Sequence, residues 1–257
     1  MTSLTYASYL KVEDLLSLQQ PQSDGPEHDE TLFIIIHQVY ELWFKEVLHE
    51  LDYVQTGFHQ NNPARVLQTL KRILTIFKTM TAQIDVLETM TPLEFLSFRG
   101  RLDSASGFQS YQFRELEFVL GHKRHSMVTH FPEGSVMRQR LEQRYHQPDL
   151  WDAFLYFLSN NGYVVPDELL NRDITQPHEA SEQVRTLLVD IYRNNLNLTQ
   201  VCERLMDMDE GIQEWRYRHV KMVERTIGFK EGTGGSSGVD YLRSTLFKPL
   251  FPDLWAI

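Results

Sequence analysis

The sequence is poor in cysteine, in positive charge and in long apolar runs. Cys202 is the only cysteine, which excludes an intrachain disulfide, a cysteine zinc site and an iron–sulfur cluster. The net charge is -10, which argues against the basic face that nucleic-acid binding requires. No apolar run is long enough to cross a bilayer, and residues 1–10 lack the pattern of a signal peptide. We therefore expect a cytoplasmic protein that binds neither nucleic acid nor a membrane.

Several catalytic motifs are also absent. Neither His-Glu-x-x-His nor Gly-x-Ser-x-Gly occurs. A carboxylate-bridged di-iron bundle needs two Glu-x-x-His motifs, and only Glu46-x-x-His49 is found, which we interpret as a surface pair. The glycine-rich segment 232–238 has no lysine and does not follow a predicted strand, so it is not a nucleotide loop. It is either a surface loop or a lid that closes over a substrate.

What the sequence does contain is a helical pattern over most of its 257 residues. Apolar residues make up 42% and charged residues 23%, as in an ordinary globular protein. The segment Thr91-Pro92-Leu93-Glu94 has the spacing of a helix capping box. Caps and breakers predict helices at about 29–57, 62–89, 92–99, 109–120 and 199–227, shorter helices within 134–196, and a short broken helix over 241–255. We predict an all-α helical bundle, with residues 1–257 as one domain and long helices shared across subunits.

Two of the long predicted helices carry a histidine on an apolar face. His219 shares a face with Trp215 and Met222, and His37 shares one with Phe33 and Tyr40. A histidine in such a stripe can be a core residue that is hydrogen-bonded to a backbone carbonyl. Alternatively, one imidazole in an apolar wall is the iron ligand that haem requires. The spacing leaves both interpretations open.

Arg99 is predicted near the end of a short helix, on the same face as Phe95. An arginine there can form a surface salt bridge, or it can bind a carboxylate with its guanidinium fork. The residues by themselves thus indicate an acidic all-helical protein with two histidines on apolar faces and a glycine-rich loop.

The order of several motifs resembles the tryptophan 2,3-dioxygenase family. The resemblance covers nearly the whole chain and rests on LTYASYL (4–10), LFIIIHQVYELWFK (32–45), FR (98–99), SGFQS (106–110), WRYRH (215–219) and GFK followed by GTGGSSG (228–230 and 232–238). Ordered motifs along one chain are far more specific than any one of them. The resemblance implies a homotetramer of long helices that binds haem b.

The resemblance also implies roles for individual residues. His219 is expected to be the axial ligand of the haem iron, and Ser106 and Gly107 to lie beside the haem and the substrate. His37 is expected to be the catalytic residue, which accepts a hydrogen bond from the indole N–H and orients the substrate more than it acts as a base. The remaining expected substrate contacts are Phe33, Phe95, Arg99 and Thr233, with Tyr6, Tyr9 and Leu10 reaching in from the N-terminal segment 1–20 of a neighbouring subunit.

The implied substrates are L-tryptophan and O2, and the implied product is N-formyl-L-kynurenine, in the first step of the kynurenine pathway. Arg99 is expected to pair with the substrate carboxylate. Some relatives carry tyrosine at position 95. Phe95 lacks the hydroxyl group with which that tyrosine could bind the carboxylate. Two alternatives are a dioxygenase of broader indole specificity and a haem-based sensor without turnover.

Overall fold

The structure, a computed structural model, describes residues 3–102, 105–228, 230 and 238–257. Every regular element in these ranges is a helix, so the predicted all-α class is confirmed. None of the described helices is both long and apolar enough to cross a membrane.

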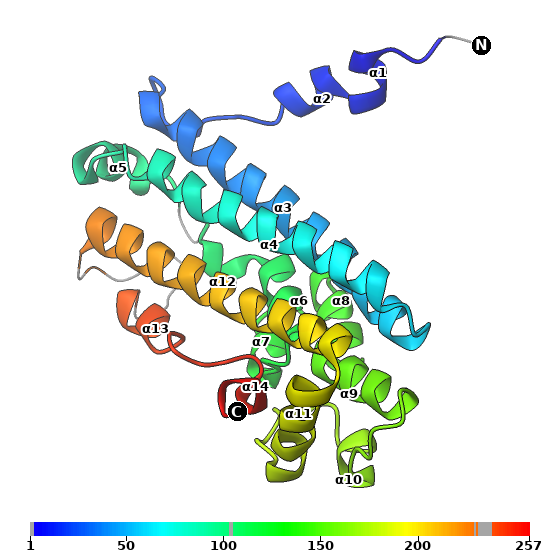
Figure 1. Cartoon of the computed structure of the whole chain (residues 1–257). Coiled ribbons are helices and arrows are strands. Elements are labelled where there is room, and N and C mark those ends of the chain that lie inside the picture. Colours follow the sequence, from blue (N-terminus) through cyan, green and yellow to red (C-terminus); the bar gives the residue numbers. More distant parts are fainter. Residues whose placement is uncertain (1–2, 103–104, 229, 231–237) are drawn as a thin grey trace.

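Three long helices form the body of the molecule: α3 (His28–His59), α4 (Pro63–Leu87) and α12 (Leu196–Ile227). They run side by side in Figure 1, with α4 packed against both of the others. The side chain of Asn62 caps α4 and Pro63 occupies its first turn, as the sequence predicted. Helix α12 begins at Leu196, three residues before the predicted Thr199, because Asn195 caps it.

Short helices that follow α4 along the chain carry several of the predicted site residues. Helix α5 (Pro92–Arg99) begins with the predicted capping box, in which Thr91 and Glu94 exchange hydrogen bonds. The predicted helix at 109–120 is instead a 3-10 turn, η1 (Gly107–Gln109), followed by α6 (Tyr111–Val119). Ser110 separates the two elements because its side chain caps α6.

The remaining helices after α6 are short. They are α7 (His125–Thr129), α8 (Val136–Tyr145), α9 (Leu150–Asn160), α10 (Asp167–Leu170), α11 (Glu182–Asn194), α13 (Val239–Arg243) and α14 (Pro252–Trp255).

The predicted helix at 241–255 was only partly right, because α13 and α14 are separate helices. Buried Asp209 of α12 holds the segment between them by accepting from the backbone N–H groups of Leu250 and Phe251 and from Trp255 Nε1.

The N-terminal helices α1 (Tyr6–Leu10) and α2 (Val12–Leu16) bury none of their residues. In Figure 1 they extend away from the helical body, and the chain joins that body where α3 begins. The side chains of Tyr6, Tyr9 and Leu16 are 78%, 69% and 67% exposed. Apolar side chains held this far from their own core are typical of a segment that packs on another molecule.

Candidate active site

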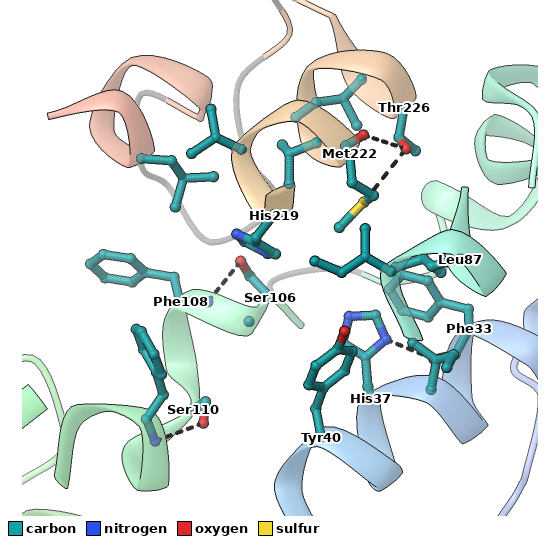
Figure 2. A pocket seen from close by; sticks show the side chains of 18 of the residues that line it. Phe33, His37, Tyr40, Leu87, Ser106, Phe108, Ser110, His219, Met222 and Thr226 are labelled. Carbon is teal, nitrogen blue, oxygen red and sulfur yellow. Dashed lines mark hydrogen bonds between the residues drawn. The ribbon is translucent and has the colours of Figure 1, made fainter. Parts of the chain in front are cut away.

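A cavity lies between the long helices α3 and α12, and it contains about 1670 Å³ of empty space, part of it open to solvent. In Figure 2, His37 and Tyr40 on α3 face His219 on α12 across this space. The cavity is lined by seven of the residues that the sequence singled out: Phe33, His37, Phe95, Arg99, Ser106, Gly107 and His219. Three helices, α3, α5 and α12, and the 3-10 turn η1 with its cap Ser106 thus bring these residues together.

His219 is half-buried and faces the cavity. Its ring stacks on the indole of Trp215, with centroids 5.4 Å apart and an interplanar angle of 16°. Burial, with a smaller contribution from His37, lowers the pKa of His219 to about 4. The imidazole is therefore neutral at pH 7, as metal coordination requires. Within the described part of the chain, neither ring nitrogen makes a hydrogen bond, so His219 is not the backbone-bonded core histidine of the alternative interpretation.

His37 has one ring nitrogen bound and the other available. Its Nδ1 lies 2.7 Å from the backbone carbonyl oxygen of Phe33, one helical turn earlier. Because a carbonyl oxygen only accepts, Nδ1 must carry the proton, and Nε2 is then an acceptor. Burial lowers the pKa of His37 and keeps the ring neutral. The backbone contact foreseen for a core histidine is present, and it leaves Nε2 able to accept from a donor in the cavity.

An aromatic wall stands beside His37. The ring of Phe33 lies 4.1 Å from that of His37, 5.6 Å from Phe95 and 5.5 Å from Phe98, measured between centroids. Phe95 and Phe98 are buried. Phe33 and Phe95 line the cavity and present apolar ring surface with no hydroxyl group, while Phe98 packs behind them, so the wall suits a flat aromatic ligand.

Polar groups line the same space. Arg99 is half-buried at the last position of α5 and lines the cavity. Ser106 caps η1 by accepting from the backbone N–H of Phe108 at 3.3 Å. A Cβ atom added to Gly107 would meet no described atom within 4 Å, so the protein itself does not require glycine there. The absence of a side chain at Gly107 keeps that part of the cavity open for a ligand.

The other predicted contacts are not part of this cavity in one chain. Thr233 lies outside the described residues, as does most of the glycine-rich segment 232–238. Tyr6, Tyr9 and Leu10 are exposed on α1 and do not line the cavity of their own chain.

Four charged residues that line the cavity were missed from the sequence: half-buried Glu41 and buried Arg114, Glu117 and Arg216. Arg216 lies inside the WRYRH motif, and Arg114 and Glu117 are spaced by one turn of α6. That i, i+3 spacing could have signalled an ion pair, but it gave no sign that the pair is buried.

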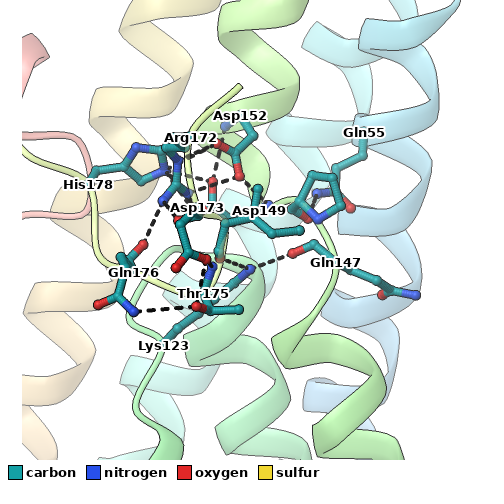
Figure 3. Close-up of polar contacts among 12 residues, drawn as sticks. Gln55, Lys123, Gln147, Asp149, Asp152, Arg172, Asp173, Thr175, Gln176 and His178 are labelled. Carbon is teal, nitrogen blue, oxygen red and sulfur yellow. Dashed lines mark hydrogen bonds and ion pairs between the residues drawn. The ribbon is translucent and has the colours of Figure 1, made fainter. Parts of the chain in front are cut away.

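A second polar cluster lies away from the cavity, at the start of α9 (Figure 3). Asp149, Asp152 and His178 have ligand atoms within 4.8 Å of one another and could hold a metal ion. Arg172, however, donates to Asp149 at 2.9 Å and to Asp152 at 2.7 Å. Lys123 also donates to the backbone carbonyl of Ile174 at 2.7 Å. The arginine supplies the positive charge that a metal would bring, so we interpret the cluster as a link between the 171–178 segment and α9.

Substitution of Arg172 tests this link. Arg172→Ala leaves buried Asp149 without its guanidinium partner, and we expect a loss of about 3 kcal/mol in the free energy of unfolding at pH 7. Arg138→Ala is the control, because its pair with Glu142 is exposed and should contribute under about 0.5 kcal/mol. Urea unfolding measures both. A loss no larger for Arg172→Ala than for Arg138→Ala would contradict the interpretation.

The same link predicts an acid-dependent stability. Burial alone would raise the pKa of Asp149, but hydrogen bonds from His178 and the Asp152 N–H and the charge of Arg172 outweigh burial, so the pKa is lowered. A depressed folded pKa stabilises the protein above the unfolded value of 3.8, and this contribution is lost as the pH falls through the folded value. We expect the wild type to lose stability more steeply below about pH 4 than Arg172→Ala does.

Comparisons with known proteins agree on one family. The family model described as tryptophan 2,3-dioxygenase matches residues 1–147 and 135–257. A protein from Herpetosiphon aurantiacus named tryptophan 2,3-dioxygenase is 62% identical over 99% of this chain and 97% of its own length. Proteins of the same name from Anaeromyxobacter sp. and Bacillus thuringiensis are 52% and 41% identical, each over 99% of this chain and over 95% and 92% of their own lengths.

Proposed function

This chain belongs to the tryptophan 2,3-dioxygenase family, and from that premise we propose that the cavity between α3 and α12 is its active site. The reaction inserts both atoms of O2 across the indole C2=C3 bond of L-tryptophan and gives N-formyl-L-kynurenine. One observation carries the assignment of the site: neutral His219 and Arg99 line the same cavity from different helices.

The residues of the cavity fit haem b. A half-buried, neutral imidazole without a described hydrogen-bond partner suits an iron ligand, so His219 would hold the metal. Ser106 and Gly107 would border the porphyrin, since the glycine leaves open space beside it. When bound, haem supplies the iron that activates O2, and the protein supplies binding, orientation and electrostatics.

Substrate orientation would follow from two kinds of contact. The rings of Phe33 and Phe95, backed by buried Phe98, would pack on the indole ring, and Arg99 would bind the carboxylate through its guanidinium fork. Phe95 adds only apolar contact, since it has no hydroxyl group. Two contacts at opposite ends of the amino acid fix the C2=C3 bond relative to the iron site and displace water from it. Thr233 is proposed, from the family resemblance, to contact the amino-acid end.

His37 would position the indole rather than remove its proton. Its Nδ1–H is engaged by the Phe33 carbonyl, so Nε2 can accept the indole N–H as a hydrogen bond. Its lowered pKa makes it a weak base, and the indole N–H is a very weak acid. A proton held between them would therefore stay on the indole nitrogen.

We further propose that residues 1–257 form one catalytic domain that assembles as a homotetramer. Segment 1–20 would then reach a neighbouring subunit, where Tyr6, Tyr9 and Leu10 complete its pocket. The exposure of α1 and α2 and their separation from the body in Figure 1 support this placement. The cytoplasmic location stays a prediction from the sequence.

Removal of residues 1–12 tests the shared pocket. We expect the affinity for L-tryptophan to fall about tenfold, because the pocket would lose aromatic contacts. Titration of the haem spectrum with L-tryptophan measures the affinity, and size-exclusion chromatography with light scattering shows whether the assembly survives. Unchanged binding by an intact assembly would mean that each pocket is complete without its neighbour.

Two experiments test the function as a whole. The purified protein should show a haem absorption spectrum and form N-formyl-L-kynurenine from L-tryptophan in air. A haem-based sensor would bind haem and L-tryptophan without product. A dioxygenase of broader specificity would oxidise tryptamine, which lacks the carboxylate, at a rate comparable to L-tryptophan, whereas a carboxylate bound by Arg99 requires a strong preference for L-tryptophan.

A further inference from the structure

Three arginines surround one buried carboxylate in the wall of the cavity. Glu117 on α6 lies 2.6 Å from Arg114 Nη1, 2.7 Å from Arg124 Nη2 and 3.2 Å from Arg216 Nη2. The side chains of Glu117, Arg114 and Arg216 are only 2%, 5% and 7% exposed. We call Arg114, Arg124 and Arg216 the arginine cluster.

The charges of this group do not balance. Three guanidinium groups face one carboxylate, and the other described partners are neutral: the hydroxyl of Tyr241 and the backbone carbonyls of Thr245 and Phe108. Within the described ranges the excess is therefore two positive charges. The Nε atoms of Arg114 and Arg216 are buried without a hydrogen-bond partner. Buried charge of one sign is costly unless a counter-charge neutralises it, so the cluster is set up to receive an anion.

The excess charge borders the space in front of His219. Arg114 and Arg216 both line the cavity, with Glu117 and Tyr241 beside them. Arg216 precedes His219 by three residues on α12, a rise of about 4.5 Å along the helix axis. The ring of Phe113 holds both guanidinium groups in place, at 5.2 Å from Arg114 and 5.9 Å from Arg216.

We propose that the arginine cluster binds the two propionate carboxylates of the haem, an inference that rests on the proposed binding of haem at His219. Two carboxylates match the two excess charges, and arginine pairs with carboxylates in a bidentate geometry. The amino-acid substrate brings a single carboxylate, which we have assigned to Arg99 on a different helix, α5. Glu117 then acts as a positioning residue, because it holds three arginines that would otherwise repel one another.

Haemin and its dimethyl ester provide the test, because they share iron and porphyrin and differ only in the propionate charges. Haem-free protein is titrated with each, and the Soret band gives the two dissociation constants. We expect the ester to bind the wild type at least about tenfold more weakly than haemin. Equal affinities for the two compounds would overturn the inference while leaving haem binding in place. A wild type that binds neither would instead overturn the proposed function, and the inference with it.

Arg114→Gln locates the effect at the cluster. It removes one guanidinium from α6 without altering the helix that carries His219. The dissociation constant of the ester divided by that of haemin should then fall toward one. Arg140→Gln is the matched control: Arg140 also pairs with a buried glutamate of α6, Glu115, at 3.0 Å, but it does not line the cavity. This control should keep the wild-type ratio.

A purely structural arginine would give a different result. Arg114→Gln would then weaken haemin and ester equally and leave the ratio at its wild-type value, which contradicts the inference. Titration of the haem-loaded variant with L-tryptophan tests whether the cluster binds the substrate carboxylate instead of the propionates. If Arg114→Gln lowers the affinity for L-tryptophan and keeps the haemin-to-ester ratio, the cluster binds substrate and the inference is wrong.

Discussion

His219→Ala is expected to lose haem and, with it, dioxygenase activity. Removal of a residue that only supports a metal ligand typically lowers metal affinity or activity by about 10–100-fold, so loss of the ligand itself should cost at least about 100-fold. The other histidine of the described cavity, His37, lies on α3 and faces His219 across the space, so it does not take the position from which α12 would hold the metal. The Soret absorbance per protein and the rate of N-formyl-L-kynurenine formation measure the two losses.

Two controls separate ligand loss from damage to the fold. Imidazole added to His219→Ala can enter the space left by the side chain and should restore part of the Soret band. Tyr217→Ala changes an exposed residue two positions earlier on α12 and should keep its haem. A full-strength Soret band in His219→Ala, without added imidazole, would mean that another residue holds the iron.

Arg99→Ala is expected to have the second largest effect, on substrate binding rather than on haem. A carboxylate buried in the cavity would lose its charged partner, a change that costs about 3–5 kcal/mol. The Michaelis constant for L-tryptophan should therefore rise by roughly 100-fold or more. The Soret band should be unchanged, because Arg99 lies on α5 and the expected iron ligand on α12.

Tryptamine and Arg101 provide the matched controls. Tryptamine has no carboxylate, so its weak oxidation should be similar in the wild type and in Arg99→Ala, and the preference for L-tryptophan should largely disappear in the variant. Arg101→Ala removes an exposed arginine that pairs with Asp24 at 3.2 Å and should leave the Michaelis constant near its wild-type value. An unchanged Michaelis constant for Arg99→Ala would remove this residue from the site.

The two substitutions thus probe residues that line one cavity from different helices. His219 tests whether the α12 side holds the cofactor, and Arg99 tests whether the α5 side holds the substrate. The haemin-ester comparison probes a third part, the arginine cluster near α6. Because each experiment has its own readout, failure of the Arg99 assignment can be told apart from failure of the haem site.

Local patterns determined the helices and the faces on which their histidines lie. The capping box at Thr91 and the Asn62-Pro63 start of α4 were readable because caps depend on residues a few positions apart. The same holds for His37 and His219, since helical periodicity alone assigns a residue to a face. The sequence also carried the family, through ordered motifs that the comparisons confirm.

Only the tertiary structure decided which faces meet. Periodicity places His37 on an apolar stripe, but it cannot say that this stripe and that of His219 border one cavity with Arg99. The arginine cluster was invisible for the same reason, because Arg114 and Arg216 are distant in sequence and meet only at Glu117. Asp209 likewise divides the C-terminal stretch into α13 and α14 through contacts with residues about 40 positions away. Helix faces are set by neighbours along the chain, whereas a cavity and its charge are set by the packing of several helices.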